Sequence, residues 1–145
     1  MKSFTITAAV VAIGLAVAAP AASGDGGQGG GDSRRADTMA VYGDAPYGVN
    51  DADTSQFEAT PAFIDAINAD PKVQRVIHVG DIHSGKQVCT DAYNLSVFAQ
   101  WTRFQDPLVY TPGDNEWADC HKKAEGRSDP LANLALVRST FLTRA

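Results

Sequence analysis

Residues 75–81 read Arg75-Val76-Ile77-His78-Val79-Gly80-Asp81, an apolar run that ends in a glycine and an aspartate. The run is too short for a helix and rich in Val and Ile, so it predicts a strand at Arg75–Val79. Glycine lets the backbone turn sharply where the strand ends. The aspartate that follows then extends a carboxylate from this turn.

The same ending follows two other strand-like runs. Thr38–Tyr42 precedes Gly43-Asp44, and Leu108–Thr111 precedes Pro112-Gly113-Asp114. Gly-Asp alone is a common turn dipeptide, so its position after all three runs carries the information. If the strands are parallel, the three carboxylates meet at one edge of the sheet, where ligands of such sheets bind. Converging carboxylates repel one another unless cations lie between them, so the pattern predicts a metal site.

Helical patterns separate the strand-like runs. One helix is predicted to begin at Thr60-Pro61 and to stop at Asn68, one to be capped by Thr90 or Asp91, and one to open at Asp129-Pro130. Strands that alternate with helices predict parallel strands joined by crossovers. The predicted fold class is therefore α/β, a parallel-strand sheet with packed helices.

The three turns resemble the motifs of calcineurin-like metallophosphoesterases. That family has Asp-x-His after its first strand, Gly-Asp after its second, and Gly-Asn-His followed by Glu or Asp after its third. This sequence has Asp44-Ala45-Pro46, Gly80-Asp81 and Gly113-Asp114-Asn115-Glu116 in the same order. Over about residues 38–123 it is most similar to the N-terminal part of an exported bacterial branch. The resemblance implies a layered α/β sandwich that hydrolyses a small-molecule phosphoester with two divalent metal ions, drawn from Mn, Fe, Zn or Mg.

The resemblance also implies roles for the matching residues. Asp44 would hold the first metal ion, and Asp81 would bridge both ions. Asp114 stands where the family has an Asn ligand to the second ion. Asn115 stands at the position of the catalytic His, which makes it a candidate both for the metal site and for catalysis.

Two departures from the family pattern affect the chemistry. Pro46 replaces a histidine ligand, and Asn115 cannot give a proton to a leaving group as an imidazolium can. His83, two residues after Asp81, is therefore a second catalytic candidate, with a plain surface or loop histidine as the competing interpretation. His78 lies inside a predicted strand and is interpreted as structural.

Two other classes of function stay open. Residues 80–87 nearly match the phosphate loop G-x-x-x-x-G-K-[ST], in which Lys86 would hold nucleotide phosphates. Gln87 replaces the hydroxyl that binds Mg²⁺ there, and Asp81 places a negative charge in the anion cradle. The other alternative is a non-catalytic exported module in which the three aspartates hold a structural cation.

The N-terminal residues predict export. Residues 1–23 combine Lys2, an apolar stretch and small residues, as a secretory signal peptide does, with a membrane anchor as the competing interpretation. Residues 24–35 form a Gly-rich flexible linker, and the domain follows at 36–145. Cleavage after Ser23 would remove one of the 12 Lys and Arg and none of the 17 Asp and Glu, leaving a net charge of −6. That balance disfavours nucleic-acid binding, and we expect a periplasmic or secreted protein without a membrane anchor.

Cys89 and Cys120 are the two cysteines, and an even count in an exported protein predicts a disulfide. Two buried free thiols are the alternative. The family completes its metal site with later histidines, whereas no histidine follows His121 here. We therefore expect residues 36–145 to be an incomplete N-terminal part of the domain, inactive as given, with an unpaired sheet edge and an uncovered apolar face.

Overall fold

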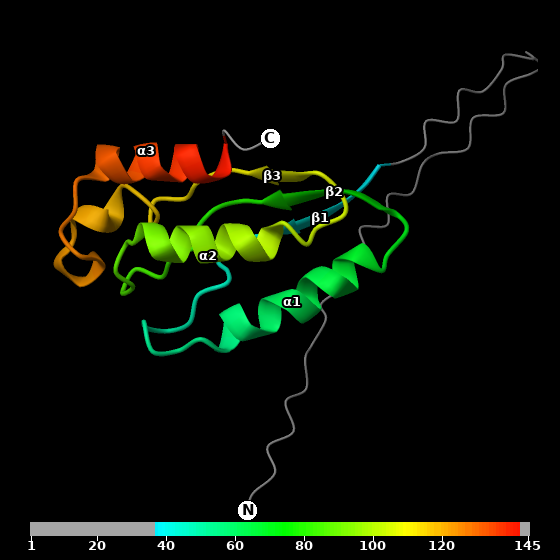
Figure 1. Cartoon of the computed structure of the whole chain (residues 1–145), viewed down its shortest axis with the longest axis horizontal. Coiled ribbons are helices and arrows are strands. Elements are labelled where there is room, and N and C mark those ends of the chain that lie inside the picture. The colour runs from blue at the N-terminus through cyan, green and yellow to red at the C-terminus, as the bar shows by residue number, and fades with distance from the viewer. Residues whose placement is uncertain (1–36, 143–145) are drawn as a thin grey trace, which may run out of the picture. The chain divides into compact units, whose positions relative to one another are not determined.

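A computed structural model describes residues 37–142, so the predicted signal peptide (1–23) and linker (24–35) lie outside the described residues. Strands and helices alternate along the chain (Figure 1): β1 Thr38–Tyr42, α1 Ser55–Asn68, β2 Val73–His78, α2 Asp91–Trp101, β3 Leu108–Tyr110 and α3 Pro130–Phe141. Two short 3-10 turns, Asp119–His121 and Lys123–Glu125, lie between β3 and α3. In this part of the chain, no helix has the length and apolar character that a membrane span requires.

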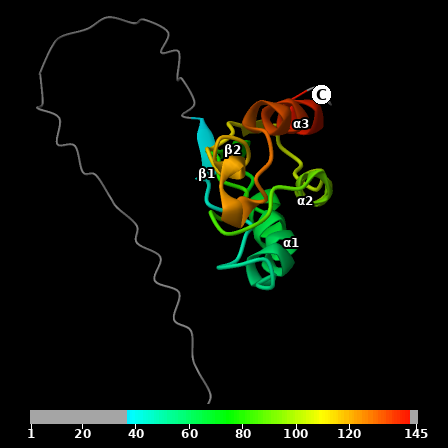
Figure 2. The same cartoon turned by 90° about the vertical axis from the view of Figure 1, so that its left-hand side faces the viewer.

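The strands form one parallel sheet in the order β1-β2-β3. Crossovers between parallel strands are right-handed, so successive crossovers in one direction place their helices on the same face. Figure 2 shows all three helices on one side of the sheet. The predicted α/β class with a parallel sheet is confirmed, and β1 has the predicted bounds.

The helix-covered face holds the core. Val76 and His78 alternate along β2 with residues of the other face, and both are fully buried. Each helix contributes to the core on this face, whose central cluster consists of Ile64, Ile82, Val97, Trp101, Tyr110 and Val137. Asp129 caps α3 through its side chain, and Thr90 caps α2 in the same way, as the sequence predicts.

Within residues 37–142, the opposite face of the sheet is largely apolar and exposed. Three apolar side chains are exposed to solvent on this face: Val41 is 60% exposed, Val79 58% and Val109 47%. Within residues 37–142 there is a single sheet and no second layer on this face. This exposure agrees with the expected apolar face, whereas the expectation that residues 36–145 form an incomplete domain stays a prediction.

The first helix begins earlier than predicted. The sequence places its start at Thr60-Pro61, whereas α1 begins at Ser55 and contains Pro61 in its interior. Proline has no N–H, so the carbonyl of Phe57, four residues earlier, loses its helical donor. The side chain of Gln100 on α2 donates to that carbonyl instead, at 2.9 Å. This bond joins α1 to α2 and makes an interior proline tolerable.

We expect Gln100→Met to destabilise the fold by about 1–2 kcal/mol, because it keeps the side-chain volume but leaves the Phe57 carbonyl without a donor. In a Pro61→Ala background, the alanine supplies a backbone N–H to the same carbonyl, so the cost of Gln100→Met should fall by about 1 kcal/mol. Urea unfolding of the four variants of this cycle measures both values. An equal loss in the two backgrounds would show that Gln100 acts through packing alone.

Candidate metal centre

The turns that follow β1 and β2 lie side by side and are bonded to each other. The N–H of Asp44 donates to the carbonyl of Gly80 at 3.1 Å, and the N–H of Ala45 donates to the carbonyl of Asp81 at 3.1 Å. These bonds extend the parallel pairing of β1 and β2 beyond the strands. They place Asp44 beside Asp81, as the three Gly-Asp endings predict.

The turn after β3 reaches Asp81 from the other side. Gly80 has φ of +106°, and a Cβ on it would lie 2.5 Å from the backbone nitrogen of Gly113. A Cβ on Gly113 would in turn lie 2.0 Å from Oδ1 of Asp81. Both positions therefore need glycine, because any side chain would push the two turns apart. Asp81 is the central carboxylate of the three.

Two of the aspartates have an unusual backbone conformation. Asp44 has φ of +53° and Asp81 has φ of +57°, in the left-handed region that non-glycine residues seldom adopt. Asp and Asn occupy this region at lower cost than other side chains. Strained backbone of this kind gathers at functional sites when the surrounding structure holds it in place.

Glu116 holds the turns after β2 and β3 together. Its side chain is 1% exposed, and Oε1 accepts the N–H of Ile82 at 3.1 Å, the N–H of Gly113 at 3.2 Å and the hydroxyl of Tyr110 at 2.7 Å. Burial and the Glu116 carboxylate raise the pKa of Tyr110, so this hydroxyl keeps its proton and donates. The sequence motif contains Glu116, but the pattern alone assigns it no such role.

Negative charge accumulates around Asp81. Burial is the largest cause that raises the pKa of Asp81, and the carboxylates of Glu116, Asp114 and Asp44 raise it further. The N–H of Asn115, 3.4 Å from Oδ1, opposes this effect in part. Within residues 37–142 none of the three predicted aspartate ligands forms a salt bridge. A bound cation would relieve this repulsion.

Tyr47 is a site residue that sequence reasoning missed. Its hydroxyl donates to Oδ1 of Asp44 at 2.7 Å, and burial followed by this hydrogen bond raises the pKa of Tyr47. The bond orients one predicted metal ligand from within its own turn. No pattern in the sequence indicates it, because the contact depends on how residues 44–47 fold.

The two catalytic candidates differ in position. Asn115 lies beside Asp81, but its amide donates to the carbonyl of His83 at 3.0 Å. His83 is fully buried, and its Nε2 bonds Oδ1 of Asn94 at 2.8 Å rather than any of the three aspartates. Burial lowers the pKa of His83, which favours the neutral imidazole. The structure therefore brings Asp44, Asp81, Asp114 and Asn115 to one edge and places the imidazole of His83 in the interior.

His78 has the structural position that the sequence predicts. Its Nδ1 accepts the N–H of Gly80 at 3.1 Å, so Nε2 carries the proton and donates to the carbonyl of Ala45 at 2.9 Å. Burial lowers the pKa of His78 and keeps the ring neutral. The ring thereby fixes both the turn after β1 and the turn after β2.

The phosphate-loop alternative lacks the helix that it requires. In that motif a helix follows the Lys directly and points its N-terminus at the phosphates. Here α2 begins only at Asp91, and Lys86 lies in an exposed turn. The geometry favours the carboxylate edge over a nucleotide cradle.

Cys89 and Cys120 form a disulfide, as predicted. The bridge joins the segment after β2 to the segment after β3, and the N–H of Cys89 donates to the carbonyl of Glu125 at 3.0 Å. A disulfide is compatible with an oxidising compartment outside the cytosol.

No protein-family model, curated protein or solved structure matches this chain. The likeness to calcineurin-like metallophosphoesterases therefore depends on the turn motifs alone and stays a prediction. Within residues 37–142, no three His, Cys, Asp or Glu side chains lie close enough together to hold a metal ion. Asp44, Asp81 and Asp114 therefore do not form a closed three-carboxylate site within these residues.

We expect loss of the disulfide to destabilise the domain by about 3–4 kcal/mol, because the cysteines are 31 residues apart and the bridge restricts the unfolded chain. Urea unfolding of the full chain with and without a reducing agent measures this difference. A Cys89→Ser, Cys120→Ser double variant is the control and should not respond to the reducing agent. Two free thiols in oxidised material, detected by mass spectrometry, would contradict the pairing.

We expect Asp81→Asn to stabilise the metal-free chain at pH 7, by roughly 2–4 °C in melting temperature. The raised pKa of Asp81 means that the folded state holds its proton more tightly than the unfolded state. Its contribution to stability is therefore full at low pH and is lost as pH rises through the folded pKa. Asn keeps the backbone conformation and the shape without the charge. Melting in a chelator at pH 3 and pH 7 tests this, with Asp106→Asn as control, and a gain that is equal at both pH values would contradict the charge argument.

Proposed function

We propose that this protein serves metal-dependent phosphoester hydrolysis outside the cytosol. One observation supports this most strongly: Asp44, Asp81 and Asp114 follow three neighbouring parallel strands, and burial, together with the carboxylates of Glu116, Asp114 and Asp44, raises the pKa of the central Asp81. Hard oxygen ligands at the carboxyl edge of a parallel sheet suit divalent cations.

The place of Asp81 between Asp44 and Asp114 along the sheet edge suggests how two ions would be held. Asp44 and Asp81 would hold one ion, and Asp81 and Asp114 would hold the other, so that Asp81 serves both. Water would complete each shell, because divalent ions take four to six or more ligands. When bound, such ions neutralise phosphoryl oxygens and make hydroxide available near neutral pH.

The protein's own residues would position these groups. Tyr47 orients the carboxylate of Asp44, and Glu116 fixes the backbone of the two turns that carry Asp81 and Asp114. The amide of Asn115 could turn from the His83 carbonyl to a phosphoryl oxygen. Because Asn115 cannot act as an acid and the His83 imidazole is buried, the site suits a leaving group that departs as a stabilised anion.

The uncovered sheet face supports the layered arrangement that the family resemblance implies. Val41, Val79 and Val109 expose apolar surface on the face opposite to the helices. A second layer packed against this face would remove that surface from water. We include this layered α/β sandwich in the proposal.

We expect Asp81→Asn to abolish stabilisation by Mn²⁺, because both proposed ions depend on Asp81. Asp114→Asn should keep most of that stabilisation, because it restores the family's usual amide ligand. Thermal melting and calorimetric titration of the full chain with Mn²⁺ measure both variants. If Asp114→Asn removes Mn²⁺ binding as fully as Asp81→Asn, the assignment of Asp81 as the shared ligand is wrong.

Turnover distinguishes an enzyme from a metal-binding module. We expect no more than a trace of Mn²⁺-dependent hydrolysis of bis(p-nitrophenyl) phosphate, in line with the expected inactivity of residues 36–145, and Asp81→Asn should abolish that trace. Asn115→His should raise the rate by about 10-fold or more, since a positioned acid contributes on the order of 10²–10⁴-fold in established enzymes. Mn²⁺ binding without turnover in either the wild type or Asn115→His would favour the non-catalytic module.

A further inference from the structure

Glu125 is a buried charged residue that neither the fold nor the proposed function explains. It lies in the 3-10 turn Lys123–Glu125 and is fully buried. Neither Oε1 nor Oε2 of its carboxylate accepts a hydrogen bond within residues 37–142. Buried carboxylates are nearly always paired or hydrogen-bonded, because a charged group without a partner is costly in the interior. An unsatisfied carboxylate of this kind therefore indicates a partner such as an ion or a proton.

A second acceptor oxygen lies near the Glu125 carboxylate. The amide N–H of Asn115 donates to the carbonyl of His83 at 3.0 Å, so the other amide atom, Oδ1, is an acceptor. A Cβ on Gly85 would lie 3.9 Å from this Oδ1 and 3.9 Å from Oε1 of Glu125. Within residues 37–142, no other heavy atom beyond the chain neighbours of Gly85 lies within 4 Å of that position. Two acceptor oxygens therefore border one open position that holds no donor.

A metal ion needs less room beside a buried oxygen than a water molecule does. Ca²⁺ lies about 2.3–2.6 Å from its oxygen ligands, whereas a hydroxyl hydrogen bond spans about 2.5–3.0 Å between oxygens. An ion can therefore bind the Glu125 carboxylate although water does not reach it. Gly85 has no side chain and is exposed, so an ion can enter from its side and keep water ligands there.

We propose that Glu125 and Asn115 bind a calcium ion beside Gly85, through the carboxylate of Glu125 and the amide oxygen of Asn115. Carboxylates, amide carbonyls and water are the ligands that Ca²⁺ takes, and it accepts irregular geometry, whereas Mg²⁺ demands a near-ideal octahedron. The site has one acidic ligand. It therefore does not require the group of three His, Cys, Asp or Glu side chains that residues 37–142 lack.

The charges around Glu125 favour a cation. Burial raises the pKa of Glu125, and the carboxylates of Asp119 and Asp114 raise it further, whereas Lys122 opposes them. Lys122 forms its ion pair with Asp119 and not with Glu125. A cation would relieve the repulsion among these carboxylates. A proton is the rival occupant, because it would neutralise Glu125 alone.

The proposed calcium ion would be distinct from the candidate metal centre. It would join the segment after β2, which contains Gly85, to the segment after β3, which contains Asn115, and to the turn that ends at Glu125. Neither Asp44 nor Asp81 is among its ligands, so the inference does not depend on the proposed phosphoester hydrolysis.

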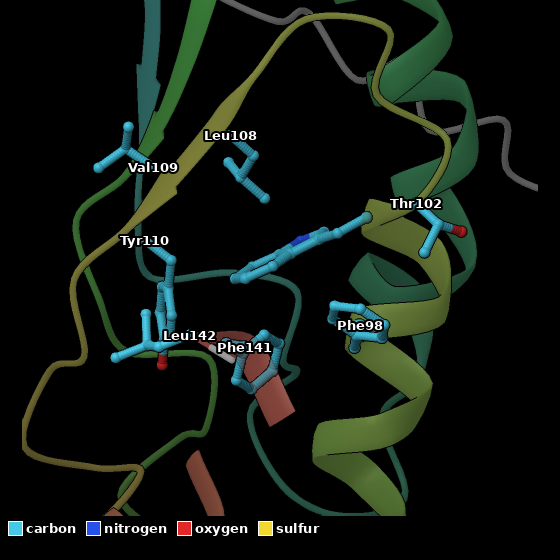
Figure 3. Close-up of a pocket in the computed structure, with 8 residues that line it drawn as sticks. Phe98, Thr102, Leu108, Val109, Tyr110, Phe141 and Leu142 are labelled. Atoms are coloured by element: carbon cyan, nitrogen blue, oxygen red, sulfur yellow. The ribbon is translucent and has the colours of Figure 1, made fainter. Parts of the chain in front are cut away.

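The groove along β3 offers no rival site for a cation. It has a volume of about 490 Å³, and Leu108 and Tyr110 face Phe98 and Phe141 across it (Figure 3). Its lining residues, all within 37–142, include no charged side chain. A calcium response of the chain would therefore come from the carboxylates near the turns.

Calcium titration of the full chain carrying Asp81→Asn isolates this site, because that variant lacks the shared ligand of the proposed metal centre. With a dissociation constant of about 10⁻³ M, as in extracellular calcium modules, about 10 mM Ca²⁺ should raise the melting temperature by roughly 5–10 °C. Adding Glu125→Gln should remove this shift, because Gln keeps the shape without the charge. Adding Asp119→Asn instead should keep most of it. NaCl at equal ionic strength controls for screening.

Calorimetric titration should count one Ca²⁺ per Asp81→Asn chain and none once Glu125→Gln is added. No calcium shift in Asp81→Asn, or the same shift with and without Glu125→Gln, would overturn the proposal. If Glu125 holds a proton instead, calorimetry should detect no bound Ca²⁺ in either chain, which also overturns it. Should the double variant fail to fold by circular dichroism, Asn115→Ala in the Asp81→Asn background still decides. It should weaken calcium binding several-fold, because the ligand set determines the affinity of such sites, and unchanged binding would contradict the assignment.

Discussion

One buried carboxylate oxygen, Oε1 of Glu116, accepts three hydrogen bonds and so holds the candidate site together. Oε1 of Glu116 takes donors from the turn after β2, from the turn after β3 and from the ring of Tyr110 on β3. Each donor would be buried without a partner if this oxygen were absent. The close approach of Gly80 and Gly113, and with it the central position of Asp81, depends on this convergence. The geometry of the charged edge therefore depends on hydrogen bonds to Glu116, although the Glu116 carboxylate itself adds to the negative charge around Asp81.

The charged edge of the sheet destabilises the folded chain, whereas the contacts around it stabilise the turns. Asp44 and Asp81 adopt left-handed backbone conformations, and burial, with three neighbouring carboxylates, raises the pKa of Asp81. Neither feature helps the chain to fold. The imidazole of His78 restrains the turns after β1 and β2, and Glu116 restrains the turns after β2 and β3. The disulfide joins the segments that follow β2 and β3. Strained backbone and crowded charge of this kind gather at functional sites, which is why we propose a ligand-binding role for this edge.

Much of this arrangement could be predicted from the sequence because its causes are local. Apolar runs that end in Gly-Asp determine where β1, β2 and β3 end, and side chains such as Thr90 and Asp129 cap the helices that follow. The start of α1 was predicted wrongly, since the bond that accommodates Pro61 comes from Gln100, far along the chain. The bond from Tyr47 to Asp44 and the burial of His83 beneath α2 also escaped prediction, because both depend on tertiary packing.

The two faces of the sheet give the molecule the character of an amphiphile. Helices carry Glu58, Asp65 and Arg138 outward on one side, while Val41, Val79 and Val109 expose apolar surface on the other. A body built in this way lowers its free energy wherever water meets an apolar phase. At an air bubble, a plastic wall or an alkyl resin, the domain would therefore adsorb with its valine face inward and its charged helices still in solution. The concentration measured in solution would therefore fall in vessels whose walls adsorb the protein.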